Sequence, residues 1–338
     1  MAGEGPGRDG LENRTMTTAN DVTPLRIERS AYQFSAVRAL IAQKETALRT
    51  GLRSALSDWG FRNLVSTGQM QEAIGVLQSP EIPDVVLIDS DLSGGEVTEL
   101  IREVRYSRLG DNPFIVAIGI IRNPTPDRVR QMVNSGVDFL VTWPVSSHAI
   151  WARVMASIEQ RKKFVVVSDY IGPDRRETPR QDESRFGLDV PNTFRDKVLG
   201  HWDQITVSRQ IQSAKVEVLS RRAARLSFRI LVLAELMRRS FSAGALDPAA
   251  AALAELADRL GEFRRDIHFS RFPHVHSLAQ SLERTSVWIA QSGGQPHPLD
   301  LSLASETAME LVLSVEPGRT IIDVRQEAAE SLKQIRAH

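Results

Sequence analysis

Apolar residues between about positions 36 and 162 follow two patterns that alternate along the chain. Short apolar runs such as "AVRALIA" and "DVVLID" are typical of buried strands. Between these runs, apolar residues recur every three or four positions; Leu48, Leu52 and Leu56, for example, share one face of a predicted helix. Strands are predicted at 36–42, 61–67, 84–89, 113–121 and 137–142, and helices at 45–59, 70–77, 96–104, 127–133 and 146–161. This alternation predicts a parallel sheet covered by helices on both faces.

The second half of the chain has a different pattern, because strand signals fade after about residue 194. Apolar residues on its first long helix step alternately by three and four, which is the seam of a heptad pattern. The seam consists of Val216, Leu219, Ala223, Leu226, Ile230, Leu233 and Met237. Breaks such as "SAGALDP" and Gly293 divide the segment into about five helices. The seam fits a homodimer built around the helix at 211–240, and it fits the core of a bundle within one chain equally well.

Two polar segments define the predicted boundaries. Residues 1–33 are Gly-rich, polar and without periodicity, which is typical of a disordered tail. Residues 163–193 begin with a short apolar run, "FVVVSDY", which could add a short strand or an extended arm. The turn signal "GPDRR" and many charges follow, and the segment as a whole is predicted to be a flexible linker. The prediction is therefore an α/β domain at 34–162, a linker at 163–193 and an all-α domain at 194–338.

The composition narrows the class of protein. The 338 residues are 42% hydrophobic, and Lys plus Arg equal Asp plus Glu at 42 each. This balance gives no overall attraction to nucleic acid or to anionic membranes. Cysteine is absent, which excludes disulfides, thiolate metal sites and cysteine nucleophiles. Because no apolar run approaches roughly 18 residues and no signal-peptide core is visible, we expect a cytoplasmic protein without a membrane partner.

The third predicted strand ends on an acidic residue. Asp89 closes the run "DVVLID", and Asp91 follows in the loop before Gly94 and Gly95. Ligands and chemistry in open α/β sheets lie at the carboxyl ends of the strands, so both carboxylates should emerge at that edge. Two acids at a strand end are, by themselves, also what an ordinary solvated loop contains.

The order of elements and the segment "VVLIDSDLSGGEVTELIREVR" resemble the receiver domain of bacterial two-component response regulators. Gly136 in "NSGVDF" and Pro144 in "TWPVSS" also match that family. The resemblance covers 36–162 and implies a flavodoxin-like, doubly wound sheet of five parallel strands. It also implies that Asp89 accepts a phosphoryl group from a histidine kinase, that the backbone at Asp91 helps to hold Mg²⁺, and that the Trp143–Pro144 bond is cis.

This chain departs from the family's pattern at the positions that support phosphorylation. Gln43 and Lys44 stand where the family carries an acidic pair that binds Mg²⁺. Ile118 and Gly119 stand at the switch position, where the family has Thr or Ser, and Trp143 replaces the Lys before the proline. Mg²⁺ prefers several hard oxygen ligands, and phosphoryl transfer needs its developing charge neutralised. We therefore predict a pseudo-receiver without a cofactor, in which Mg²⁺ matters only if the site is active.

Lys44 and Trp143 each have two interpretations. Lys44 either forms an ion pair with Asp89 or Asp91 in place of the metal, or points into solvent as surface lysines usually do. Trp143 either presents an apolar ring to a protein partner, or packs against the helix predicted at 146–161.

The "YIGPDRR" string resembles a tail that follows receiver-like domains in some bacterial regulators. It begins a small basic cluster of Arg175, Arg176 and Arg180. The last two have the R-x-x-x-R spacing of PilZ domains, which bind cyclic-di-GMP, and guanidinium groups bind phosphates well. The companion D/N-x-S-x-x-G motif is absent, so a solvated linker is the main interpretation and nucleotide sensing is an alternative.

Three functions compete for the helical half. The heptad seam favours protein interaction or dimerisation. Histidine phosphotransfer would use His268, His274 or His276, although these lie beside the helix break at Pro273 rather than at mid-helix. DNA binding would use the arginines of the long helix, which spread around it instead of lining one face. The arginines are Arg221, Arg222, Arg225, Arg229, Arg238 and Arg239.

Together, these features predict an atypical signalling protein, similar to a response regulator, that acts through protein–protein contacts. No P-loop, G-x-S-x-G, H-E-x-x-H or diguanylate cyclase signature indicates an enzyme. One alternative is a functional phosphorelay regulator, phosphorylated on Asp89, that controls the helical output domain. The other is a DNA-binding or nucleotide-sensing regulator. We expect a protein partner, with a histidine kinase as one candidate.

Overall fold

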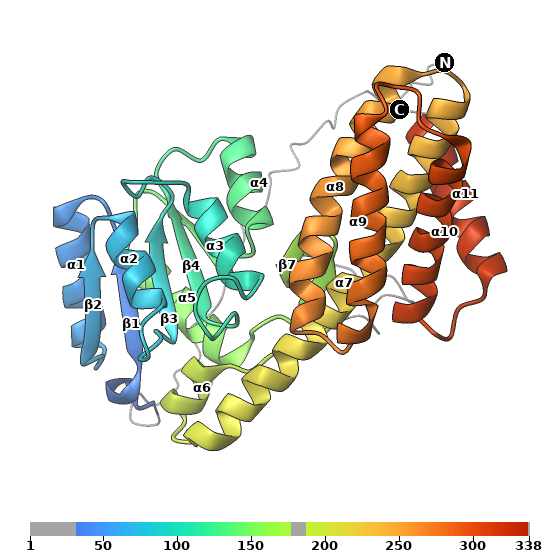
Figure 1. Cartoon of the computed structure of the whole chain (residues 1–338). Helices are drawn as coiled ribbons and strands as arrows, with labels where there is room; N and C mark the ends of the chain where they lie inside the picture. Colours follow the sequence, from blue (N-terminus) through green and yellow to red (C-terminus); the bar gives the residue numbers. More distant parts are fainter. Residues whose placement is uncertain (1–31, 177–186, 337–338) are drawn as a thin grey trace, which may run out of the picture. The chain divides into compact units, whose positions relative to one another are not determined.

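A computed structural model describes residues 32–176 and 187–336 of the chain (Figure 1). Most of the predicted tail at 1–33 lies outside the described residues, and so does Arg180 of the predicted linker. The described residues from Gln33 onwards belong to one compact unit.

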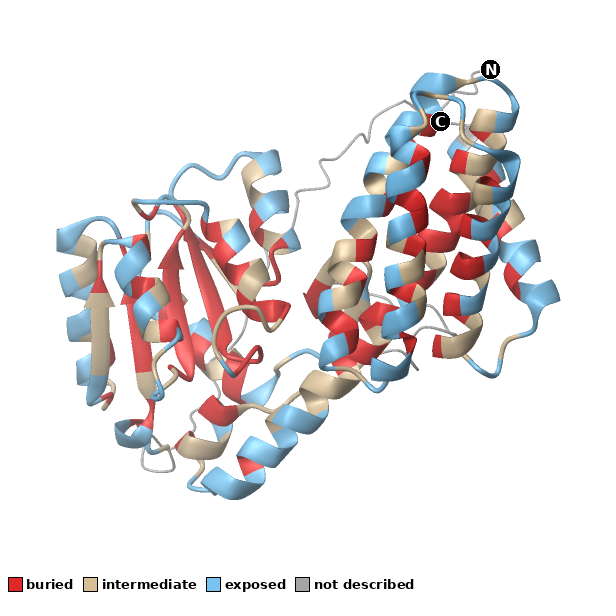
Figure 2. Cartoon of the chain, in the orientation of Figure 1, coloured by how far each residue is buried: buried red, intermediate tan, exposed pale blue. Residues whose placement is uncertain are grey.

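Five parallel strands form the predicted sheet, and each lies within its predicted range. They are β1 (Arg38–Ala42), β2 (Asn63–Thr67), β3 (Val85–Asp89), β4 (Val116–Ile121) and β5 (Phe139–Thr142). Their order is β2-β1-β3-β4-β5, which is the strand order of the flavodoxin-like doubly wound fold. Every residue of β3 and β4 is buried, because helices cover both faces of the sheet (Figure 2). The near-continuous apolar runs of these strands follow from that burial.

The helices between the strands also agree with the sequence pattern. They are α1 (Thr46–Asp58), α2 (Met70–Leu77), α3 (Val97–Arg105), α4 (Pro126–Asn134) and α5 (Ser147–Glu159). Local chemistry sets several of their ends. The Thr125 side chain accepts a hydrogen bond from the backbone of Arg128 and caps α4, and Pro126 takes the first helical position. Gly60 adopts a φ of 103° just after α1, a conformation that favours glycine.

The predicted linker begins with a folded hairpin instead of a flexible segment. Its strands, β6 (Phe164–Val167) and β7 (Tyr170–Pro173), pair in antiparallel fashion. Phe164 forms a further β-bridge with Leu188, and both Phe164 and Ile171 are buried. This part of the segment folds because burial of a few apolar side chains against the rest of the chain outweighs the polar composition of the segment. Their cluster also contains Tyr106, Phe114 and Val218.

The "YIGPDRR" segment connects this hairpin to the sheet domain through hydrogen bonds and close backbone packing. Arg175 donates hydrogen bonds to the carbonyl oxygens of Asp138, at 3.0 Å, and Val137. The backbone of β7 also approaches Gly136, where a Cβ atom would lie 2.6 Å from the carbonyl oxygen of Ile171. Only glycine tolerates that approach, and its φ of 96° requires glycine as well. The string therefore has a structural role that its sequence did not reveal.

The end of the predicted linker also packs on the sheet domain. The side-chain amide of Asn192, which precedes α6 (Thr193–Val198), donates a hydrogen bond to the carbonyl oxygen of Ser157 at 2.7 Å. The ring of Phe194 lies 6.2 Å from the ring of Phe61, measured between centroids. The short 3₁₀ helix η2 (Phe34–Ala36) adds another aromatic ring to the same cluster. This packing buries rings from three separated parts of the chain.

The C-terminal part is helical, as predicted. Its elements are α7 (Gln204–Ser242), α8 (Leu246–His268), η3 (Pro273–Val275), α9 (His276–Gln291), α10 (Pro298–Val315) and α11 (Ile321–Arg336). From Ala223 to Met237, the seam of α7 is buried in a core shared with the other long helices. Leu219 is also buried, whereas Val216 is half-buried. The seam thus serves this chain's own bundle. Within the described ranges, every helix is too short or too polar to span a membrane.

Candidate functional site

The carboxyl-terminal edge of the sheet carries Asp89. This residue ends β3 and is only 6% exposed. Its Oδ1 atom accepts a hydrogen bond from the backbone N–H of Asp91 at 3.0 Å, which holds the carboxylate beside the loop. Asp89 therefore lies at the edge where open α/β sheets carry their chemistry.

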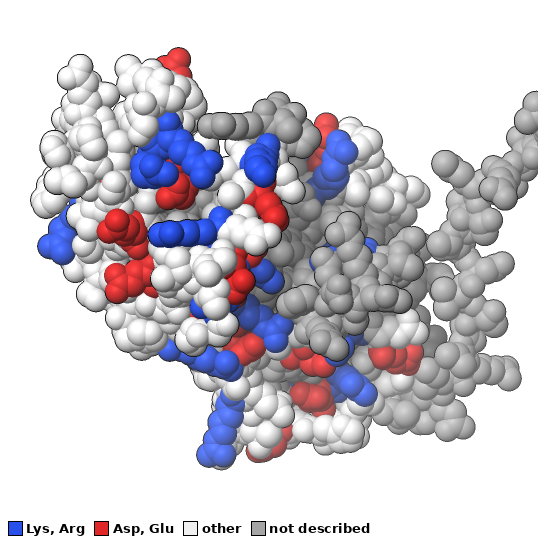
Figure 3. Space-filling view, turned by 90° about the vertical axis from the view of Figure 1, so that its right-hand side faces the viewer, with Lys and Arg blue, Asp and Glu red and all other residues white. Residues whose placement is uncertain are grey.

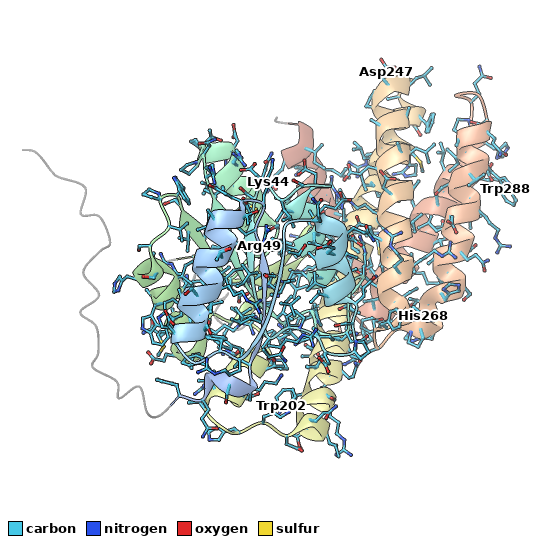
Figure 4. The ribbon with its side chains drawn as sticks, turned by 90° about the vertical axis from the view of Figure 1, so that its left-hand side faces the viewer. Lys44, Arg49, Trp202, Asp247, His268 and Trp288 are labelled. Atoms are coloured by element: carbon cyan, nitrogen blue, oxygen red, sulfur yellow. The ribbon has the colours of Figure 1, made fainter. Side chains whose placement is uncertain are left out.

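Lys44, which follows β1, does not contact the acids at this edge of the sheet. Gln43 is buried, and its Oε1 atom accepts a hydrogen bond from the backbone N–H of Glu45 at 3.0 Å. Lys44, labelled in Figure 4, is exposed. Among the described residues, no ion pair joins it to Asp89 or to Asp91, whose partner is Arg128. The hypothesis of a Lys44 ion pair is therefore wrong, because the side chain extends into solvent.

Two arginines instead approach the acids of this edge. Arg128 of α4 forms an ion pair with Asp91. Arg122, which follows β4, forms an ion pair with Glu45. The hydrogen bond with Glu45 raises the pKa of Arg122, and the carboxylates of Asp89 and Asp91 act in the same direction. Two guanidinium groups therefore lie near the acids of this edge, and each forms its ion pair with an acid other than Asp89.

Trp143 lies beside these arginines. The Trp143–Pro144 peptide bond is cis, as predicted. The Arg122 guanidinium lies 4.8 Å from the centre of the Trp143 ring, within range of a cation–π interaction. Trp143 remains 41% exposed. The aromatic ring is therefore positioned by Arg122 and still open to a partner.

The register between β3 and β4 decides which residue lies opposite Asp89. Ile118 and Gly119 pair with earlier residues of β3, and Asp89 lies opposite Ile120. The side chain across from Asp89 is therefore aliphatic. A Cβ on Gly119 would lie 2.7 Å from the terminal methyl of Met132, so this glycine serves packing of α4 against the sheet. The sequence did not reveal which residue of β4 lies beside Asp89, because a uniformly apolar strand does not show its register.

The residues at this edge do not fit the Mg²⁺ that the resemblance implies. Mg²⁺ requires several oxygen ligands in near-octahedral geometry. Arg128 holds the carboxylate of Asp91, and a backbone N–H occupies the side-chain oxygen of Gln43. Across residues 32–176 and 187–336, no group of three or more His, Cys, Asp or Glu side chains is placed to hold a metal ion.

Replacement of Lys44 by alanine should leave the melting temperature unchanged within the error of the measurement. An exposed side chain without a partner contributes less than about 0.5 kcal/mol to stability. Thermal unfolding followed by circular dichroism tests this expectation, with Lys162→Ala as a second exposed lysine for comparison. A decrease of several degrees in the Lys44 variant alone would show that this ammonium group has a structural partner.

The three candidate phosphotransfer histidines lie at helix ends, as the sequence indicated. His268 is the last residue of α8, His274 lies in η3, and His276 is the first residue of α9. All three are exposed. Figure 4 shows His268 at the opposite end of the helices from Asp247 and Trp288. This placement does not provide the mid-helix histidine that phosphotransfer needs.

A buried charged network lies in the sheet domain, and the sequence pattern gave no sign of it. Arg105 of α3 is 1% exposed and donates a hydrogen bond to Asp138 at 2.7 Å, and Arg161 donates to the same carboxylate at 3.0 Å. The ring of Phe164 lies 5.1 and 5.2 Å from the two guanidinium groups. Burial acts to raise the pKa of Asp138, but Arg161 and Arg105 outweigh it, so this pKa lies below its usual value. Nothing in the segment "NSGVDF" distinguished this carboxylate from a surface one.

A second buried network surrounds Arg222 of α7, which is 0% exposed. Its guanidinium donates to Asp266 at 2.6 Å, to Glu262, and to the carbonyl oxygen of Ser168 at 3.0 Å. It also lies 4.1 Å from the centre of the Tyr106 ring. Burial raises the pKa of Asp266 to about 6, although Arg222 acts in the opposite direction. Arg222 thus links the end of α3, the β6–β7 turn and α8. In the sequence, nothing distinguishes it from the other arginines of α7.

No protein-family model and no curated protein matches this chain. Solved structures match part of it. A CheY-like receiver domain from Methanospirillum hungatei is 19% identical with a TM-score of 0.34, and the match covers 37% of this chain and 95% of that domain. A response regulator from Thermotoga maritima is 22% identical with a TM-score of 0.31, covering 35% and 94%. An adenylate cyclase from Rhodopirellula baltica is 24% identical with a TM-score of 0.32, covering 37% and 88%. Response-regulator receivers are therefore among the proteins that the N-terminal part resembles, and the helical part remains unassigned.

Proposed function

We propose that this chain is a signalling protein whose receiver-like part acts through contacts with another protein and is not conventionally phosphorylated. The observation that carries the proposal is the occupation of the acidic edge by arginines. Arg128 holds Asp91, and Arg122 holds Glu45. These ion pairs satisfy the carboxylates without a metal, and phosphoryl transfer to Asp89 would lack the cation that neutralises its charge.

The surface beside this edge supports a protein partner. Trp143 exposes part of its ring next to the guanidinium of Arg122. Tryptophan and arginine are both enriched among the residues that dominate binding at protein interfaces. In this proposal, the chain is a non-enzymatic regulator, and the helical part is its output module.

DNA binding receives less support from the helical part. On the face shown in Figure 3, basic and acidic side chains are interspersed over the surface. Several arginines of α7 already have acidic partners, as Arg229 has Glu255 at 2.7 Å and Arg238 has Glu235 at 2.9 Å. A DNA-binding surface instead gathers unpaired basic side chains on one face.

One observation favours the alternative of a functional phosphorelay regulator. Only Oδ1 of Asp89 accepts a hydrogen bond from the part of the chain that the structure describes, which leaves Oδ2 available to react. Under this alternative, phosphorylation at Asp89 would have to displace or recruit Arg128, since no acidic pair is present to hold Mg²⁺.

Measuring the intact mass of the chain after incubation with acetyl phosphate and Mg²⁺ distinguishes our proposal from the phosphorelay alternative. We expect no phosphoryl gain in the native chain, because the acidic edge lacks a metal site. The Asp89→Asn variant and a receiver with a complete acidic pair are run in parallel. A gain of one phosphoryl group that disappears in Asp89→Asn would contradict the proposal and establish the alternative.

A further inference from the structure

The turn that follows α3 has a strained backbone. Among the residues that the structure describes, Ser107 is the only one other than glycine with a positive φ, at 57°. A residue with a Cβ atom adopts this left-handed conformation only at a cost in energy. The backbone N–H groups of Ser107 and Arg108 donate hydrogen bonds to the carbonyl oxygens of Val104 and Glu103, at 3.0 and 2.9 Å. Contacts made by the neighbouring side chains must therefore hold the turn in this conformation.

Arg108 lies in this turn and makes few hydrogen bonds. Its Nη1 atom donates to Glu103 at 2.9 Å, but its Nε and Nη2 atoms are buried without a hydrogen-bond partner among the described residues. Its guanidinium lies 5.1 Å from the centre of the Tyr106 ring. Its charge also acts on Asp266 of α8, in the direction that lowers the pKa of that carboxyl. Because buried nitrogens without hydrogen bonds are costly, the Tyr106 ring and the charge of Asp266 are what favours this position of Arg108.

Charged groups from three parts of the chain face Asp266, which is 2% exposed. They are Arg222 of α7, which donates to it at 2.6 Å, Arg108 of the turn after α3, and Glu262 of α8, which also pairs with Arg222. Beside them, Arg259 pairs with Asp169 of the β6–β7 turn at 2.6 Å. If Asp266 lost its charge, Arg222 would keep Glu262 as its anion. Arg108 would keep only Glu103, which does not reach its two buried nitrogens.

The effect of Arg108 on Asp266 sets the direction of a coupling between protonation and conformation. Burial raises the pKa of Asp266 to about 6, and Arg108 acts in the opposite direction. If Arg108 moved into solvent while Asp266 stayed buried beside Arg222, the pKa of Asp266 would rise further. By linkage, protonation of Asp266 therefore favours the conformation in which Arg108 has moved away.

We propose that Asp266 is a pH-sensitive switch that controls the turn after α3. While its carboxylate is charged, Arg108 stays inside and the turn keeps the strained conformation of Ser107. When the carboxyl becomes neutral, below about pH 6, Arg108 moves into solvent and the backbone of Ser107 relaxes. The contact between the end of α3 and α8 is then weaker. This switch does not depend on the phosphorylation state of Asp89.

Hydrogen–deuterium exchange of the full chain at pH 7.5 and at pH 5.0 tests the proposal, with Asp266→Asn as a mimic of the neutral carboxyl. At pH 7.5, the amides of Ser107, Arg108 and Leu109 should exchange about tenfold faster in the variant than in the native chain, because the turn opens more often. At pH 5.0 the two should agree, since the native carboxyl is then neutral. Each comparison is made at a single pH, so the pH dependence of the exchange chemistry cancels.

Two control variants isolate the carboxyl of Asp266. Asp258→Asn alters an exposed carboxylate of the same helix and should exchange like the native chain at both pH values. His268→Gln removes the exposed histidine at the end of α8, which is close to Asp266 along the chain. This variant should keep the native response to pH. A response that disappears in His268→Gln would assign the titration to the histidine and overturn the proposal.

A further variant keeps the test independent of whether Asp266→Asn folds, which circular dichroism establishes. In Arg108→Gln the cation is absent, so the carboxyl carbon of Asp266, followed by NMR against pH, should titrate at a higher pH than in the native chain. Three results would each overturn the proposal: equal exchange of the native chain and folded Asp266→Asn at pH 7.5, a difference that persists at pH 5.0, or a titration of Asp266 that Arg108→Gln does not move.

Discussion

Replacement of Arg222 by alanine should lower the free energy of unfolding by about 3–5 kcal/mol, the loss typical when one partner of a buried ion pair is removed. The substitution leaves the carboxylate of Asp266 buried without its cation, and it leaves the carbonyl oxygen of Ser168 without a donor. Urea unfolding of the native chain and the variant measures the difference. Arg221→Ala is the matched control, because the neighbouring arginine forms an i,i+4 pair with Glu217 that is worth about 0.3–0.5 kcal/mol.

The loss caused by Arg222→Ala should also depend on pH. The pKa of Asp266 is about 6 in the folded chain, against a usual value of 3.8, so between these values the folded state binds the proton more readily than the unfolded state. Without Arg222 this pKa rises further, and protonation removes the unpaired charge. The variant should therefore lose less stability at pH 5 than at pH 8. A loss that is the same at both pH values would contradict a charged Asp266 in the folded chain.

Replacement of Asp138 by alanine should destabilise the sheet domain by a similar amount, about 3–5 kcal/mol. Its carboxylate accepts hydrogen bonds from Arg105, Arg161 and the backbone N–H of Ala117, at 2.7, 3.0 and 2.8 Å. Removing it leaves two buried guanidinium groups without their anion. Asp127→Ala serves as the control in the same unfolding measurement, because Asp127 is exposed and pairs with an exposed arginine.

The lowered pKa of Asp138 gives this effect a pH signature. The unfolded state takes up the proton near 3.8 and the folded state only at lower pH, so the stabilisation is complete above about pH 5 and declines as the pH falls below 4. The difference in stability between the native chain and Asp138→Ala should shrink over that range. A difference that stays constant down to pH 3 would show that Asp138 does not titrate with a lowered pKa.

Both networks meet at the hairpin that the sequence presented as a linker. The ring of Phe164 in β6 lies within cation–π range of the guanidinium groups of Arg105 and Arg161, and Ser168 of the β6–β7 turn accepts a hydrogen bond from Arg222. Contacts therefore run from Arg105 in the sheet domain, through the hairpin, to Arg222 of α7. This chain of contacts is the physical link that the proposed signalling function requires between its two parts.

The sequence by itself determined the element order, because its apolar periodicity changes between the two halves and because Gly and Pro mark the ends of many elements. It also determined that Asp89 lies at the carboxyl edge of the sheet and that Gln43 cannot supply an acidic ligand. These conclusions depend on residue type and position along the chain, which neighbouring elements do not alter.

Only the tertiary structure decided which charges meet. At the acidic edge, the cations that form ion pairs are Arg128 and Arg122, where the sequence had suggested Lys44. Among the six arginines of α7 considered above, Arg222 is the one that is buried. The tertiary structure also placed Ile120 opposite Asp89 and packed most of the heptad seam into the chain's own core. The reason is common to these cases: a long, charged side chain or an apolar strand can take several partners, and the packing of distant segments chooses among them.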